Sequence, residues 1–393
     1  MDNNVDEQFS HNHTVEENRK YPGPLAAGVF FTITTLLLTY GGILLPFRNN
    51  FLNSGFGEIL FILLPVIIFL FIGKYDIKGT LKLRKIKPIN YLVIPALMIF
   101  SLPIVAIVNA ITLGLIRLIF GKNLPVDQIA VSDVPTLLIA ILVIGVSAAV
   151  CEETLFRGLI SKSYERYGVI ASLAITSILF GILHRDIQKC IGVTLLGVLI
   201  GFIVYRTQSI YAGMIAHFTN NTIIVFFLYS TSSTLEQMRE DGSLQFNNFD
   251  FSSISIISWI FVIIFYMMVL LVSVAVFVAL LYAFCKINKV NSQATEFNKV
   301  LELNDIDLGQ EEMNLVQDSS LMNQKNSLEN QTDDVLISKS SKSRKLSVAG
   351  FLAVLPGLIL IILTFIGEIL ELMNINSGTL YNVLKALWLI SPK

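Results

Sequence analysis

The feature that most limits the possible folds of this chain is a series of apolar stretches, each about 20 residues long or longer. Hydrophobic residues make up 54% of the sequence and charged residues only 15%, whereas a soluble domain carries about 25% charged residues. Stretches of this length cross a bilayer as helices, because the strands of a membrane barrel need only about 10 residues of alternating polarity. The sequence therefore predicts an all-α, polytopic transmembrane helical bundle of about 8–9 spans.

The charge of the connecting segments predicts the orientation of these spans. We expect spans near residues 25–45, 58–72, 91–120, 135–166, 169–184, 191–205, 210–229, 254–284 and 346–370. The strongest basic cluster follows the second of them and consists of Lys74, Lys78, Lys82, Arg84, Lys85 and Lys87. Basic loops stay in the cytoplasm, so we expect a multi-pass protein of the cell membrane with a cytoplasmic N-terminus.

Composition also divides the chain into segments. We expect a polar N-terminal tail (1–21), N-terminal transmembrane helices (22–130), a core (131–231), an outside loop with the eighth span (232–286), a polar and mostly disordered cytoplasmic loop (287–345), and a C-terminal span with a tail (346–393). The three cysteines form no C-x-x-C pair and are expected to be small buried hydrophobes. The lipid bilayer is the expected surrounding. No basic patch favours a nucleic acid partner.

Three ionisable side chains interrupt the fourth apolar stretch, at Glu152, Glu153 and Arg157. A charge at membrane depth costs about 2.5–3.5 kcal/mol, so such residues are rare and are often functional. Residues four apart share a helix face, so Glu153 is expected to pair with Arg157. Glu152 points about 100° away. It is left as an unpaired carboxylate, which makes it a candidate general base. The alternative is a buried ion network that only holds helices together.

Two histidines and an amide complete a candidate site. With a helical turn at 167–168, Glu152 and His184 each lie about 23–25 Å from that turn, so an antiparallel helix pair brings them to the same depth. His217 and Asn221 are four residues apart and share a face of the seventh span. An imidazole and a carboxamide side by side can donate hydrogen bonds to a developing oxyanion.

These side chains could hydrolyse an amide with activated water, in one of two ways. Glu152 with His184 could take the proton of the water directly. Alternatively, a Zn²⁺ ion held by Glu152, His184 and His217 could lower the pKa of a bound water toward about 7. The H-E-x-x-H motif of zinc proteases is absent. Both possibilities, zinc or no cofactor, remain open from the sequence.

Three groups of residues in this chain also resemble the motifs of a known family. The pattern resembles the three motifs of the CPBP (CAAX protease and bacteriocin-processing, or Abi) intramembrane endopeptidases, which include type II CAAX prenyl proteases and lysostaphin-resistance-like proteins. In this chain the motifs are Glu152-Glu153-x-x-x-Arg157, Phe180-x-x-x-His184 and His217-x-x-x-Asn221. The similarity covers about residues 130–230, and the segments on either side contribute nothing to it.

The resemblance implies a helical bundle with a water-accessible polar cavity among the motif helices. The base of the family corresponds to Glu152, and its supporting pair corresponds to Glu153 and Arg157. The position that activates water in the family matches His184. The positions that face the substrate carbonyl match His217 and Asn221, and Phe180 matches a position that lines the cavity. Family members are described as metalloproteases, and a metal-free glutamate mechanism also fits these residues.

The resulting hypothesis is an intramembrane endopeptidase of the CAAX prenyl protease 2 type. Its substrate would be a peptide or protein, either membrane-anchored or a leader peptide. The alternative is a non-catalytic membrane protein, such as an immunity factor, a scaffold or a transporter, that uses the buried charges structurally. A transporter is the less favoured of these, because no matched pair of interrupted half-helices is evident.

Overall fold

The structure, a computed structural model, describes residues 20–45, 50–125, 131–240, 255–289, 347–375, 377–387 and 389. Within these ranges the chain forms helices and turns, and no strand. Eight helices are long and apolar enough to cross a membrane, and a ninth apolar helix covers Val169–Leu183. The predicted all-α, polytopic bundle is confirmed. Nearly all of the N-terminal tail and of the 287–345 loop lies outside the described residues.

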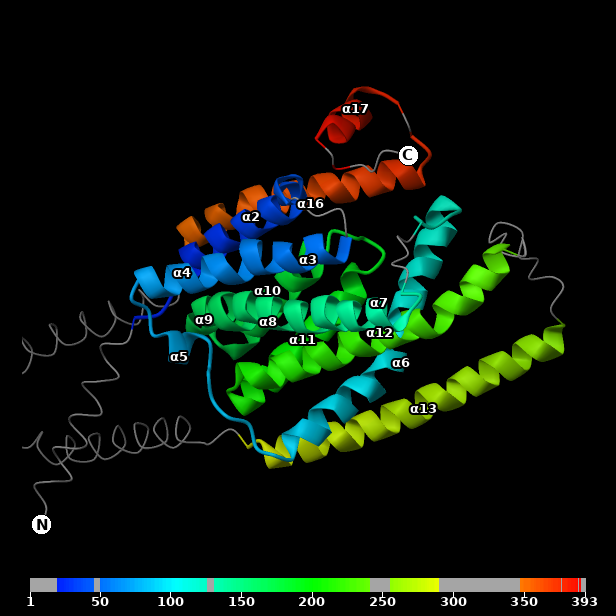
Figure 1. The fold of residues 1–393 in the computed structure, drawn as a ribbon, viewed down its shortest axis with the longest axis horizontal. Helices are drawn as coiled ribbons and strands as arrows, with labels where there is room; N and C mark the ends of the chain where they lie inside the picture. Colours follow the sequence, from blue (N-terminus) through cyan, green and yellow to red (C-terminus); the bar gives the residue numbers. More distant parts are fainter. Residues whose placement is uncertain are drawn as a thin grey trace, which may run out of the picture. The chain divides into compact units, whose positions relative to one another are not determined.

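The helices follow the apolar stretches closely (Figure 1). The first part of the chain forms α2 (Pro24–Tyr40) with the 3-10 turn η1 (Gly41–Leu44), α3 (Asn50–Glu58), the π-helical η2 (Ile59–Leu63), α4 (Leu64–Ile72), α5 (Ile77–Thr80) and α6 (Asn90–Phe120). The fourth span consists of α7 (Val134–Ala140), the π-helical η3 (Ile141–Ser147), α8 (Ala148–Glu153), the π-helical η4 (Thr154–Ile160), α9 (Ser161–Tyr164) and the 3-10 turn η5 (Glu165–Tyr167). The rest forms α10 (Val169–Leu183), α11 (Cys190–Thr207), α12 (Ile210–Glu240), α13 (Ile256–Ile287), α16 (Val348–Leu372) and α17 (Thr379–Ala386).

The second span begins earlier than the sequence predicted. It covers Phe51–Ile72 rather than starting at Glu58. Asn53 and Ser54, two polar residues in this earlier part of the span, both line a cavity. Because of the earlier start, Glu58 lies inside the span rather than at its edge.

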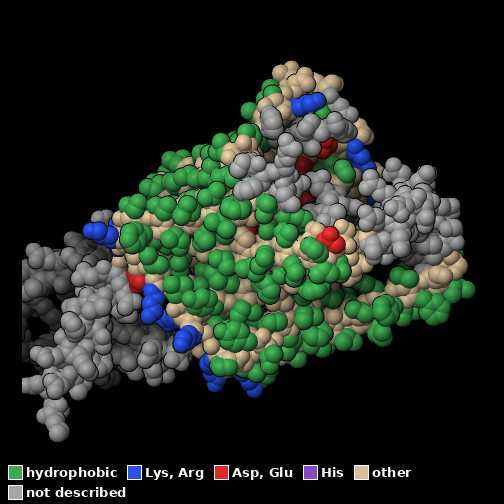
Figure 2. Space-filling model, in the orientation of Figure 1, with side chains coloured by type: hydrophobic (Ala, Val, Ile, Leu, Met, Phe, Trp, Pro, Cys, Tyr) green, Lys and Arg blue, Asp and Glu red, His purple; other side chains and the backbone are tan. Residues whose placement is uncertain are grey.

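One end of the bundle carries the basic cluster that follows α4, and we call it the basic end. Lys82 binds Glu165 at 2.7 Å, and its carbonyl accepts a hydrogen bond from the Ile210 amide at 3.1 Å. The Tyr167 hydroxyl accepts a bond from the Ser347 amide at 3.0 Å. These contacts bring four segments together, namely the turns that follow α4, η5 and α11, and the start of α16. Figure 2 shows Lys and Arg side chains below a broad hydrophobic surface near this end.

The opposite end of the bundle is closed by contacts between other turns. The Gln188 side chain, in the loop between α10 and α11, accepts a hydrogen bond from the Leu124 amide at 3.0 Å. The Ser232 hydroxyl donates to the Val131 carbonyl at 2.7 Å. Back at the basic end, the hairpin that joins η5 to α10 turns at Gly168, whose φ of +95° suits glycine. Successive helices therefore alternate between the two ends, as a polytopic protein requires.

The α16 helix packs along α2 and supports the loop that follows α10 (Figure 1). The Thr32 hydroxyl donates to the Ala353 carbonyl at 2.6 Å and accepts from the Gly357 amide at 3.2 Å. A regular helix would pair these two backbone groups with each other. Farther along α16, Glu368 accepts a hydrogen bond from the Ile187 amide at 2.9 Å. The last span thus fixes the loop that begins at the end of α10.

Candidate active site

A fully buried ion network joins the fourth and seventh spans. Glu153 Oε1 lies 2.9 Å from Arg157 Nη1, and their side chains are 0% and 2% exposed. The same oxygen lies 2.9 Å from His217 Nδ1. Arg157 Nη2 donates to the Gly197 carbonyl at 2.9 Å. The predicted pairing of Glu153 with Arg157 is confirmed, and it extends to His217 on a third element.

Glycine makes room for this network. A Cβ atom at Gly213 of α12 would lie 2.8 Å from Glu153 Oε2. That distance is shorter than any ordinary contact, so a larger residue would push α12 away from α8. The close approach of the two helices is what allows His217, one turn later on α12, to reach Glu153.

Glu152 lies on a different side of α8 and faces a cavity of about 360 Å³. Its side chain is 16% exposed, and its Oε2 atom is buried without a hydrogen-bond partner. The nearest basic atom is Nε2 of His217 at 3.8 Å, which is longer than a hydrogen bond. The sequence prediction that Glu152 is the unpaired acid therefore agrees with its surroundings.

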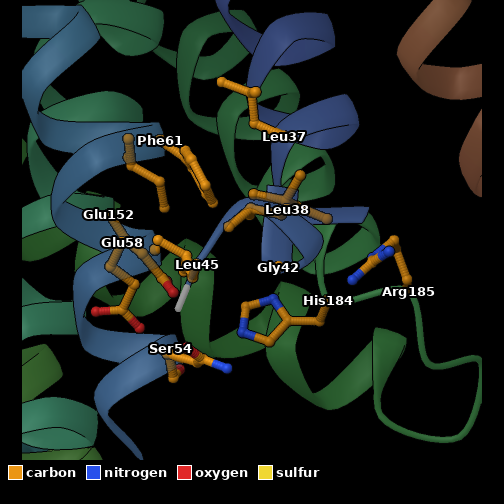
Figure 3. Close-up of a pocket in the computed structure, with 14 residues that line it drawn as sticks. Leu37, Leu38, Gly42, Leu45, Ser54, Glu58, Phe61, Glu152, His184 and Arg185 are labelled. Atoms are coloured by element: carbon orange, nitrogen blue, oxygen red, sulfur yellow. The ribbon is translucent and has the colours of Figure 1, made fainter. Parts of the chain in front are cut away.

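His184 lines the same cavity from the end of α10 (Figure 3). Its side chain is exposed, so it stands where the cavity opens. The Nδ1 atom lies 3.0 Å from the Phe180 carbonyl. A carbonyl can only accept, so Nδ1 carries the hydrogen, and Nε2 of the neutral ring keeps a lone pair. The antiparallel pair of helices brings Glu152 and His184 to one cavity, as the count of residues from the turn predicted.

Phe180 packs between the two histidines. Its ring centroid lies 5.1 Å from that of His184 and 5.8 Å from that of His217. The Arg157 guanidinium stacks on the same ring at 4.5 Å. Through these contacts Phe180 separates the buried network from the exposed imidazole, and it holds both rings in place.

His217 and Asn221 lie behind Glu152 and are not among the residues that line the cavity. Asn221 Nδ2 donates to the Ile144 carbonyl at 2.8 Å, and its oxygen accepts from the Asn220 amide at 3.1 Å. One amide hydrogen of Asn221 is thus committed to the backbone of the fourth span. The structure brings His217 close to Glu152, whereas Asn221 is tied to η3.

Two π-helical segments flank the helix that carries the two acids. They are η3 and η4, on either side of α8. The sequence predicted one uninterrupted α-helix here. Such π turns often occur at functional sites, because they change which side chains face one side of a helix. The Ile144 carbonyl that binds Asn221 belongs to the first of them.

The sequence interpretation missed Glu58. This residue ends α3 and lines the cavity together with Glu152, Asn53 and His184. Its Oε2 atom is buried and has no hydrogen-bond partner. Figure 3 shows the Glu58 and Glu152 side chains next to each other, across the cavity from the His184 ring. An acid followed by fourteen apolar residues is the available signal, and the sequence prediction places the start of the span at this acid.

The arrangement of these side chains does not fit a zinc ion. Among the described residues, no three His, Cys, Asp or Glu side chains converge in a way that could hold a metal. The zinc ligands suggested by the sequence do not face one common point, because His217 points its Nδ1 at Glu153 while His184 lies at the cavity opening. The classification as a metalloprotease therefore gains no support.

Comparison with known proteins identifies the segment that carries this site. Residues 134–223 match the family model described as type II CAAX prenyl endopeptidase Rce1-like. This match supports the resemblance of the segment to the CPBP family. The segment contains Glu152, His184, His217 and Asn221, and it covers less than a quarter of the chain. Glu58 lies outside it.

One relative supports the same assignment at moderate similarity. The chain is 30% identical over 109 residues to "Putative membrane peptidase YdiL" of Bacillus subtilis (strain 168). The alignment covers 27% of this chain and 43% of that protein, so the chain spans less than half the length of the relative. No solved structure matches the chain. Together with the eight apolar helices, these matches support a multi-pass membrane protein, one segment of which is similar to membrane peptidases.

Proposed function

We propose that this protein is an intramembrane endopeptidase that hydrolyses a peptide bond with water activated by Glu152. The observation that carries the proposal is the position of Glu152, which lines the same cavity as His184 and has a buried carboxylate oxygen without a hydrogen-bond partner. A carboxylate with no partner in an apolar bundle is costly. Its place beside the neutralised Glu153 pair indicates that it serves chemistry rather than stability.

In the proposed reaction Glu152 removes a proton from a water molecule as the water oxygen attacks the peptide carbonyl carbon. The protonated Glu152 then gives this proton to the leaving nitrogen, and the carbon–nitrogen bond breaks. The Nε2 lone pair of His184 can accept a hydrogen bond from the same water and orient it. No metal ion takes part in these steps.

The buried network would support the oxyanion that forms on the carbonyl. Nδ1 of His217 donates to Glu153, so a second proton on this ring would reside on Nε2, the atom nearest Glu152. An N–H donor there would stabilise negative charge. The second amide hydrogen of Asn221 is proposed as a further donor on the same helix face, although neither His217 nor Asn221 lines the cavity in this structure. Glu153, Arg157 and Phe180 would act by positioning these groups.

The expected substrate is a peptide or protein that reaches the cavity from the bilayer, either membrane-anchored or a leader peptide. The cavity is framed by α2, α3 and α8, which are apolar spans. A protein with a CAAX motif is one possible substrate within this class. We also propose that the protein resides in the cell membrane with its N-terminus in the cytoplasm, on the basis of the basic end.

The test compares purified parent protein with Glu152→Gln in lipid nanodiscs, using mass spectrometry of membrane and secreted peptides as the readout. The amide is nearly isosteric and cannot accept the proton. We expect cleavage to fall at least about 100-fold while the melting temperature stays the same. Glu371→Gln removes an acid of α16 outside the cavity and should cleave at the parent rate.

Two results would contradict the proposal in different ways. Cleavage by Glu152→Gln at the parent rate would show that Glu152 is not the base. A parent protein that cleaves no peptide, while folded and monodisperse, would favour the non-catalytic alternative.

A further inference from the structure

The cavity beside Glu152 contains unpaired hydrogen-bond acceptors of one kind. Three buried polar atoms on its lining lack a partner, and they are Asn53 Oδ1, Glu58 Oε2 and Glu152 Oε2. All three accept hydrogen bonds, and two of them belong to carboxylates. The lone pair on Nε2 of His184 adds a fourth acceptor. Among the described residues on this lining, no buried donor is left unpaired.

Glu58 is the group in this set that the proposed hydrolysis does not use. Its polar neighbours are the side chains of Ser147 and Glu152. The one cationic side chain on the lining is Arg185, which donates to the Thr39 hydroxyl at 2.8 Å and has Glu368 as its charged neighbour. Arg185 is therefore occupied elsewhere, and the Glu58 carboxylate has no cation of its own.

We infer that Glu58 binds a positively charged group of the substrate, the ammonium of Lys or an amino terminus, or the guanidinium of Arg, next to the peptide bond that the water activated by Glu152 attacks. These groups carry three to five N–H donors and no acceptor, which complements a cavity of unpaired acceptors. Charge-assisted hydrogen bonds of this kind are the strong ones. This recognition rests on the endopeptidase function proposed above and names its substrate class.

The position of Glu58 suits such a role. It comes from the second span, outside the segment that matches the family, so it is free to set specificity without altering the shared motifs. Glu58 and Glu152 lie side by side in Figure 3. A cation bound by Glu58 would place the adjoining backbone at Glu152. A neutral substrate side chain would leave Glu58 without a partner. The resulting loss of binding free energy would discriminate against substrates without a cation.

The experiment measures binding as well as cleavage, so that it does not depend on turnover. The probes are apolar, acetylated 20-residue peptides with one Lys at successive positions, and matched peptides with Met at the same positions. A third set carries Met and a free amino terminus, which distinguishes an amine from a side chain. Nanodiscs of zwitterionic lipid contain parent protein, Glu58→Gln or Glu371→Gln, and empty nanodiscs report binding to lipid.

We expect the parent to bind the best Lys peptide about tenfold more tightly than its Met partner. Glu58→Gln should bind both equally, within about twofold, and Glu371→Gln should keep the parental preference. The preference should persist in the non-cleaving Glu152→Gln variant, because Glu58 is intact there. Where peptides are cleaved, the ratio of kcat/KM for Lys and Met peptides should follow the same order.

Three outcomes would overturn the inference. One is a parent that binds Lys and Met peptides equally. Another is a preference for Lys that survives in Glu58→Gln with an unchanged melting temperature. The third is an equal loss of cleavage of both peptides in Glu58→Gln, which would assign Glu58 to the reaction itself. If no peptide is cleaved but the Lys preference is present and depends on Glu58, the proposed function fails while the binding site stands.

Discussion

Glu152 and Glu153 are adjacent in the chain and lie in opposite surroundings. Glu153 contacts Arg157 and His217 in a place from which water is excluded. Glu152 has no partner and faces a cavity. The helix separates the two carboxylates by about 100°, so one can contribute to the folded state while the other remains available to a substrate. Mutations at the two positions should therefore have different consequences.

Arg157→Ala should destabilise the protein strongly. The substitution leaves Glu153 charged and buried with only His217 as a partner, and it removes the stacking on Phe180. Breaking a buried ion pair from one side costs about 3–5 kcal/mol. We expect a large fall in the melting temperature of the detergent-purified protein, followed by intrinsic fluorescence. Glu152→Gln serves as the control and should melt like the parent. Equal melting of the two variants would show that the network contributes no stability.

The pairing of Glu153 with Arg157 could be predicted from the sequence because it depends only on helix spacing. The bond from Glu153 to His217 could not, because it joins residues 64 positions apart on different helices. Glu58 was missed for a related reason. Its significance comes from its neighbour Glu152 on another span, and a single acid at the margin of an apolar stretch looks like the end of a helix.

At the scale of helices, the contact between α2 and α16 depends on one hydroxyl. Pro356 has no amide hydrogen and disturbs the backbone bonds of α16 around it. The Thr32 hydroxyl binds both the Ala353 carbonyl and the Gly357 amide, which a regular helix would pair. A polar side chain of a neighbouring helix thus satisfies backbone groups near a proline, as membrane proteins require. Gly28 and Gly350 allow the close approach, since a Cβ at Gly28 would lie 2.6 Å from the Gly350 carbonyl.

Thr32→Val should weaken this helix contact. The valine has the same shape but no hydroxyl, so the Ala353 carbonyl and the Gly357 amide lose their partner. We expect a loss of about 1–2 kcal/mol, measured as a lower melting temperature. Thr32→Ser keeps the hydroxyl and should melt close to the parent. If Thr32→Val and Thr32→Ser melt alike, the hydroxyl is not what holds the two helices.

The extent of each span was predictable, whereas its internal irregularity was not. Apolar length predicted nine helices to within a few residues at most of their ends, because burying a backbone in lipid leaves few alternatives. The π-helical segments beside α8 and the Thr32 contact depend on residues of other helices. Thr32 and Ala353 are 321 positions apart in the chain, so no local sequence pattern could indicate the contact between them.

At the scale of the whole bundle, the site lies nearer the end that is not basic. His184 ends α10, which begins at the basic end and runs away from it, and Arg185 follows it on the cavity lining. Leu45, which follows η1, and Asn53 of α3 line the same cavity. The basic end carries the cluster from Lys74 to Lys87. By the positive-inside rule we expect this end to be cytoplasmic, and the cavity would then open toward the outside of the cell.

This orientation can be tested with single cysteines and a maleimide that cannot cross membranes. With Cys151, Cys190 and Cys285 replaced by Ala, Lys189→Cys reports on the loop beside His184, and Lys78→Cys reports on the basic end. Both lysines are exposed. In intact cells we expect labelling of Lys189→Cys alone, and permeabilised cells should show labelling of both. The opposite pattern would place the cavity on the cytoplasmic side, where prenylated C-termini of cytosolic proteins could reach it. The expected pattern would instead restrict substrates to peptides whose cleaved bond lies in the outer half of the bilayer.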